Sequence, residues 1–124
     1  MGLMNTLLGN VSEVNLEALQ KDFGPVLCDG EQIERAYKLM RDKWVFTNKR
    51  LIIQDVQGLT GKKKDYMSIP YRSVERFSVE TAGTFDTDAE MKIWIRGKAE
   101  PLEQKFGTDS NVVEIQKMLA QYIL

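Results

Sequence analysis

Basic residues are concentrated between positions 41 and 64 of this chain. Only two acidic residues, Asp42 and Asp55, share that stretch, so its formal charge is +5 while the whole chain carries −1. Such an imbalance indicates a surface for anions or for an acidic partner. Solvated turns are the simpler explanation, since lysine is common in exposed turns, and one half of a head-to-tail contact between subunits is a third possibility. The candidate partner or anion surface consists of Lys43, Lys49, Arg50, Lys62, Lys63 and Lys64.

The chain of 124 residues has no histidine and a single cysteine, Cys28. The lack of histidine removes His-based acid–base catalysis, histidine-activated nucleophiles and the commonest zinc ligand. Cys28 has no histidine to activate it, so we expect a buried or inert thiol, and one cysteine cannot form an internal disulfide. We therefore expect no catalytic residue, no metal site and no cofactor. A reducing, cytoplasmic location fits this cysteine content best.

Two stretches come close to known ligand-binding motifs but lack required residues. Gly58 to Lys63 approaches a phosphate-binding loop, but Val56 stands where the first glycine is needed, and a strand is expected to follow. The carboxylates at 86, 88 and 90 have the spacing with which calcium loops begin, but Met91 replaces the required glycine. We expect a solvated turn and a solvated acidic loop.

The strands that would position these residues are organised around residues 42–56, DKWVFTNKRLIIQDV. Two arms rich in β-branched and aromatic residues flank a short polar connector, which predicts a β-hairpin. Asn48 in the connector tolerates the left-handed backbone that a tight hairpin loop needs. Alternating polar and apolar residues predict further strands, and together they extend over about 32–107.

Helical spacing occurs at both ends of the chain. Two short amphipathic helices are predicted over 3–23, the first with Leu3, Leu7 and Leu8 on one face, and Gly24-Pro25 is expected to end the second. A C-terminal helix is predicted over about 110–123. No linker or repeat interrupts the chain, so we interpret 1–124 as a single, mainly β domain. The expected buried stripe of the last helix is Val112, Ile115 and Leu119.

Four segments carry a more specific resemblance: FTNKRLI from Phe46, GLTGKK from Gly58, SIPY from Ser68 and FSVETAG from Phe77. With them, the chain resembles the bacterial pleckstrin-homology-like domain family, in its small, single-domain, ring-forming members, over roughly residues 3 to 122. The resemblance implies a bent antiparallel barrel of about seven strands. The C-terminal helix would cap one open end, and two short helices would precede the strands.

The resemblance also implies a non-enzymatic module for protein–protein interaction or scaffolding. It would act as a closed homo-oligomeric ring, with five subunits as the best estimate and an unidentified protein partner. Lipid-binding relatives in eukaryotes hold inositol phosphates along the loop between the first two strands; here that loop is only about 41–43, which argues against phosphoinositide binding. The alternative is a peripheral membrane or anion-binding module that uses the basic 41–64 region. Trp44 and Trp94 lie mid-strand among aliphatic residues, which favours packing over stacking on nucleic acid, so no nucleic-acid partner is expected.

Overall fold

The computed structural model describes residues 16–39, 41–81, 89–106 and 112–124. The first predicted helix, with Leu3, Leu7 and Leu8, lies outside these ranges. Within the chain two compact units are distinguished, Met1–Ser68 and Ile69–Leu124, and each is described by itself. The single-domain interpretation stays a prediction.

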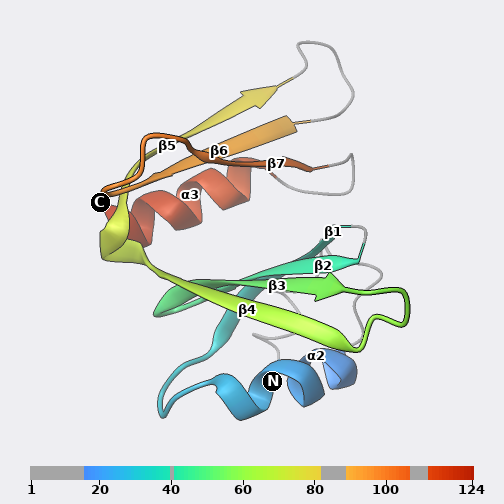
Figure 1. The fold of residues 1–124 in the computed structure, drawn as a ribbon. Coiled ribbons are helices and arrows are strands. Elements are labelled where there is room, and N and C mark those ends of the chain that lie inside the picture. Colours follow the sequence, from blue (N-terminus) through green and yellow to red (C-terminus); the bar gives the residue numbers. More distant parts are fainter. Residues whose placement is uncertain (1–15, 40, 82–88, 107–111) are drawn as a thin grey trace. The chain divides into compact units, whose positions relative to one another are not determined.

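In its described residues, the first unit has the α-helix α2 and a four-stranded sheet with strand order β1-β2-β3-β4, whose last strand runs two residues past Ser68 (Figure 1). The predicted hairpin is present: β2 and β3 are antiparallel, with Val45 opposite Ile52 and Trp44 opposite Ile53. Val45 and Ile52 are fully buried, as the apolar arms of the hairpin predicted. The elements are α2 (Leu16–Phe23), η1 (Gly24–Val26), β1 (Ile33–Leu39), β2 (Asp42–Thr47), β3 (Arg50–Gln57) and β4 (Lys63–Pro70).

Helix α2 buries one of its faces against the rest of the first unit. Leu19 and Phe23 are four residues apart, so they lie on the same side of the helix, and both are fully buried. The Phe23 ring meets Tyr66 of β4 edge-on, with 5.6 Å between ring centroids. Helix α2 ends at Phe23, directly before Gly24-Pro25, as the sequence predicted, although Gly24 opens a 3-10 turn and does not form a left-handed glycine cap. The chain continues as the 3-10 turn η1, and Pro25 fits the start of that turn because its missing N–H would have no helical partner there.

Strand β1 departs from the strict alternation that the sequence suggested. The pairing with β2 shifts between Ile33 and Arg35, which is the signature of a β-bulge. Ile33, Ala36 and Tyr37 are buried, and because Ala36 and Tyr37 are adjacent, the period of two is lost within this strand. A bulge inserts one unpaired residue into the strand. The side chains after it therefore point to the opposite face of the sheet from the one that strict alternation assigns to them.

The second unit has a three-stranded antiparallel sheet, β5-β6-β7, and the C-terminal helix α3. Helix α3 contacts η2 and β5, and it buries Ile115 and Leu119 as predicted, while the side chain of Val112 lies outside the described part. Tyr122 of α3 stacks on Tyr71, with 5.0 Å between ring centroids and 14° between planes. The elements are η2 (Tyr71–Ser73), β5 (Val74–Thr81), β6 (Ala89–Ile95), β7 (Leu102–Phe106) and α3 (Val112–Ile123).

The mainly β composition, the seven strands and the C-terminal helix agree with the sequence. The expected barrel is not closed, because the described strands form two separate hydrogen-bonded sheets. The first sheet ends at Pro70, which has no backbone N–H to extend the pairing. The chain then makes the 3-10 turn η2 before β5 begins a new sheet.

Candidate functional site

The candidate basic residues lie at two different ends of the first sheet (Figure 1). Consecutive strands run in opposite directions, so the β1–β2 and β3–β4 turns share one end, and the β2–β3 turn lies at the other. Lys62 stands at the first end and Lys49 at the second. They are separated by β3, whose eight residues correspond to roughly 25 Å of extended chain. The structure therefore does not gather the six predicted residues into one surface.

The β3–β4 turn presents one exposed apolar side chain, Leu59, followed in the sequence by exposed lysines. We call Gly58 to Lys63 the Leu59 turn. Gly58 and Gly61 adopt φ values of 81° and 71°, which other residues avoid, and the Gly61 amide donates to the Gly58 carbonyl over 3.3 Å. The Arg41 guanidinium also donates to the Gly58 carbonyl and joins the two turns at this end. The side chains of Leu59, Lys62 and Lys63 are exposed to solvent.

Two other candidate lysines have partners within the first unit. Lys64 lies 3.6 Å from a carboxylate oxygen of Asp22 on α2, and the Lys43 ammonium lies 3.5 Å from the side-chain oxygen of Gln54. Gln54 is fully buried and donates to the Tyr66 hydroxyl over 3.0 Å. Burial is the main reason that the pKa of Lys43 is lowered; Asp22 opposes the shift, and neighbouring ammonium groups add to it. Lys64 thus links β4 to α2 while it stays exposed, and Lys43 contacts the neighbouring strand β3.

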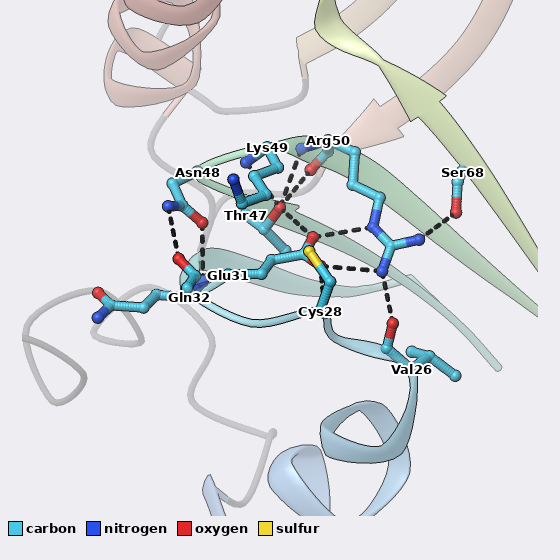
Figure 2. A network of polar contacts seen from close by, with 10 residues as sticks. Val26, Cys28, Glu31, Gln32, Thr47, Asn48, Lys49, Arg50 and Ser68 are labelled. Carbon is cyan, nitrogen blue, oxygen red and sulfur yellow. Dashed lines mark hydrogen bonds and ion pairs between the residues drawn. The ribbon is translucent and has the colours of Figure 1, made fainter.

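Arg50, at the opposite end, belongs to a buried polar network around Glu31 (Figure 2). Its Nε and one Nη donate to the two carboxylate oxygens of Glu31 over 2.8 and 2.9 Å, which is a bidentate pair. The same guanidinium donates to the Val26 carbonyl over 2.6 Å and to the Ser68 hydroxyl over 2.8 Å. All three of its side-chain nitrogens are thus engaged by partners within the first unit.

The β2–β3 turn is fixed to the loop before β1 by side chains of the turn itself. Thr47 donates to Glu31 over 2.7 Å and accepts the Arg50 amide over 2.9 Å. Asn48 accepts the Gln32 amide over 2.7 Å through its side chain and donates to the Gly30 carbonyl over 3.0 Å. Thr and Asn at a turn are a recognised sequence signal for such contacts. The identity of their partners was not predicted, because those lie 16 to 18 residues away.

Glu31 is the acceptor at the centre of this network. Its side chain is fully shielded from solvent, and the Cys28 amide adds a fourth donor over 3.0 Å. Burial acts to raise the pKa of Glu31, but the hydrogen bonds from Arg50 and the other donors outweigh it and lower the pKa to about 2. The hydrogen bond to Glu31 in turn raises the pKa of Arg50. A carboxylate that stays ionised and has all its donors in place stabilises the fold and is a poor general acid.

The depressed pKa of Glu31 predicts an acid-sensitive fold. Because the folded-state pKa lies below the ordinary value of 4.5, this stabilisation is complete above about pH 4.5 and is lost as pH falls towards 2. We expect the loss to be on the order of 3 kcal/mol in the free energy of unfolding. Urea unfolding at a series of pH values measures it, with Glu31→Gln as the reference without this carboxylate. Equal pH profiles for the two proteins would contradict the prediction.

Two open β-sheets followed by a C-terminal helix are the architecture of a pleckstrin-homology-like module. The model of the bacterial PH domain family matches residues 2–123, and the chain belongs to this family. Within the described ranges, no helix is both long and apolar enough to cross a membrane. In the same ranges, no three Cys, Asp or Glu side chains are grouped so that they could hold a metal ion.

Relatives of known sequence or structure agree with this assignment. The protein YjqA of Bacillus subtilis, which is described as uncharacterized, is 51% identical over 121 residues, or 97% of each chain. A crystal structure from Shewanella loihica, described as having a pleckstrin-homology domain, superposes with a TM-score of 0.82 at 51% identity and covers 90% of this chain and 95% of its own. A pleckstrin homology domain from Shewanella amazonensis gives 0.75 at 52% identity and covers 98% of both chains.

Proposed function

We propose that this protein is a non-enzymatic protein–protein interaction or scaffold module that acts as a closed homo-oligomeric ring. Membership of the bacterial PH domain family supports a non-catalytic role. The observation that carries the proposal is the open edge formed by β4. Within the described ranges β4 pairs only with β3, and most of its side chains are exposed, including Met67 at 44%.

An open strand edge favours assembly because its outward N–H and C=O groups can pair with another chain. The sheets of the described part have further edges at β1, β5 and β7. When one edge of a protomer meets a different surface of the next, the contact is head-to-tail. Such a contact must close into a ring or grow into a fibre. A closed ring of five subunits remains our best estimate.

Light scattering after size exclusion tests this assembly. We expect a mass that is a multiple of the 14.2 kDa chain and that persists at micromolar concentration. Met67→Lys should shift the protein towards the monomer, because a lysine on an edge strand disfavours strand pairing. Gln121→Lys adds the same charge at an exposed position of α3 and should leave the mass unchanged.

The outcomes separate two claims. A mass near 14.2 kDa for the unmodified protein at every concentration would refute the ring. If Met67→Lys leaves the assembly intact, the proposal of a ring stands, but β4 is not part of the contact between subunits.

A further inference from the structure

The Leu59 turn carries an apolar side chain that the fold itself does not use. Leu59 is 106% exposed, more than any other large hydrophobic side chain among the described residues. Two glycines at positive φ form the turn, and Arg41 of the neighbouring β1–β2 turn donates to the Gly58 carbonyl. Because the backbone of the turn is held in this way, Leu59 can enter an apolar environment at little cost in conformational freedom.

The same end of the sheet carries a concentration of exposed cations (Figure 1). Residues 38–43 and 55–65, which form this end, hold six basic and three acidic residues, a net charge of +3. Two of the carboxylates, Asp42 and Asp55, are half-buried and accept hydrogen bonds from the Val56 amide and the Gln57 side chain, whereas Asp65 is exposed. The cations exposed to solvent at this end are Lys38, Arg41, Lys62, Lys63 and Lys64.

The composition of this end fits an anionic lipid bilayer better than a protein partner. Contacts between proteins are enriched in aromatic side chains and arginine, whereas lysine is depleted from them. Here four of the five exposed cations are lysines, and the apolar tip is a leucine. A single protruding side chain also needs a matching pocket on a protein surface, whereas a fluid bilayer accepts it at any point.

An apolar tip and a basic surface act together at a membrane. One inserted apolar group gives only marginal binding, and stable association takes a second signal such as a basic patch. Roughly four to eight basic side chains are typical of attraction to an anionic bilayer. Lys64 contributes less than the others, because its ammonium lies 3.6 Å from the Asp22 carboxylate. The remaining four exposed cations still meet that number.

We propose that the Leu59 turn docks reversibly onto an anionic lipid bilayer. Leu59 enters the headgroup region, the exposed cations around it face lipid phosphates, and the end of the sheet with Lys49 points away from the membrane. Lysine acts as a point charge and lacks the planar fork of arginine, so this surface recognises charge density rather than the shape of one headgroup. The contact does not depend on the proposed ring, because each protomer has its own complete turn.

Co-sedimentation with vesicles of phosphatidylcholine, with and without phosphatidylglycerol, measures this contact. We expect binding only when phosphatidylglycerol is present. Raising the salt from about 0.1 M to 1 M should abolish it, because the screening length falls from about 10 Å to 3 Å. Phosphatidylserine at the same surface charge should bind the protein equally well. Absence of binding to either anionic lipid would overturn the proposal, and so would a strict requirement for one headgroup.

Matched variants locate the contact at the turn. Lys62→Gln should weaken binding to the anionic vesicles about fivefold, and Lys62→Gln/Lys63→Gln about 25-fold. Lys49→Gln removes the same charge at the opposite end of the sheet, beyond the screening length, and should weaken binding less than about twofold. Leu59→Ser should weaken it roughly tenfold, whereas Leu59→Met keeps an apolar tip and should bind like the parent. Thermal midpoints should stay near that of the parent, because these side chains are exposed.

The fluorescence of an introduced tryptophan reports insertion directly. On vesicles with phosphatidylglycerol, Leu59→Trp should show a blue-shifted emission and quenching by brominated lipid. Lys49→Trp, at the opposite end of the sheet, should show neither. The signal of the two native tryptophans, Trp44 and Trp94, is subtracted with the parent protein. An equal response of the two variants would contradict the proposed orientation and overturn the inference.

Light scattering of each variant separates the membrane contact from self-association. A ring would present several turns to one vesicle and so multiply its affinity, which is why binding is compared between variants of equal mass. If Leu59→Ser and the double lysine variant dissociate the assembly, the turn is a contact between proteins and the inference is overturned. If they keep the mass but lower binding no more than Lys49→Gln does, it is overturned as well. A monomer that binds as described would refute the ring alone and support this inference.

Discussion

Replacing Leu119 by alanine is expected to lower the free energy of unfolding by roughly 2–5 kcal/mol, as truncation of a buried leucine does elsewhere. Leu119 is 1% exposed and lies one turn after the fully buried Ile115 on the same face of α3. This helix contacts η2 and β5. Removing its isobutyl group therefore takes apolar area out of the core and leaves a cavity that rigid neighbours fill only in part.

Urea or thermal unfolding measures the effect of Leu119→Ala. Gln116→Ala is the matched control, because Gln116 is exposed on the same helix and alanine is a strong helix former. We expect the control to change the free energy of unfolding by no more than about 0.5 kcal/mol. A parent-like midpoint for Leu119→Ala would show that α3 does not contribute a core contact at this position.

Local patterns predicted the individual elements well. The hairpin of β2 and β3 was predictable because apolar β-branched and aromatic arms flank a polar connector, and that signal lies within 15 consecutive residues, 42–56. Helix α3 was predictable from the spacing of its apolar residues, and Ile115 and Leu119 are indeed buried. In α3 the helical period decides which side chains face the core, whereas β2 buries four consecutive residues, 44–47, so its apolar composition rather than a period of two was the useful signal.

Features that depend on a residue's neighbours in space were not predictable in the same way. The bulge in β1 between Ile33 and Arg35 depends on the pairing with β2, and the alternating sequence gives no sign of it. The division into two sheets depends on which strands pair, whereas the sequence fixes only their order along the chain. Gly24-Pro25 correctly marks the end of α2 at Phe23, but the 3-10 turn that begins at Gly24 was not predicted.

The candidate surface shows the same distinction. Grouping basic residues by position placed Lys49 and Lys62 together, but antiparallel strands carry them to opposite ends of the sheet. Arg50 was counted with the exposed cations, yet a glutamate 19 residues earlier binds it. Glu31 itself has no local pattern that marks it. What remains exposed from the predicted set at one end is Lys62, Lys63 and Lys64, the last of them 3.6 Å from Asp22, with Arg41 joined to the same turn.

Glu31→Gln is expected to destabilise the fold by roughly 2–4 kcal/mol. Breaking a buried ion pair costs about 3–5 kcal/mol when the remaining charge stays buried, and the 24% exposure of the Arg50 side chain moderates that cost. The carboxylate accepts four hydrogen bonds, two at each oxygen. An amide has one oxygen, so its NH2 group would face two donors whichever way it is oriented.

The control for Glu31→Gln removes a carboxylate that lies two residues away. Asp29 is exposed, so Asp29→Asn should change the free energy of unfolding by no more than about 0.5 kcal/mol. The two variants have the same net charge, and a difference between them reports the network rather than the overall charge. Equal stabilities would mean that the network around Glu31 contributes nothing measurable.

A double variant identifies the source of the loss. In Glu31→Gln, the Arg50 guanidinium keeps only the Val26 carbonyl and the Ser68 hydroxyl as clear acceptors, so part of the cost is a charge left without its counterion. Arg50→Met removes that charge, and the stability lost in Glu31→Gln/Arg50→Met should be smaller than the sum of the two single losses. Additive losses would instead indicate that Glu31 and Arg50 stabilise the fold independently, despite the bidentate geometry that joins them.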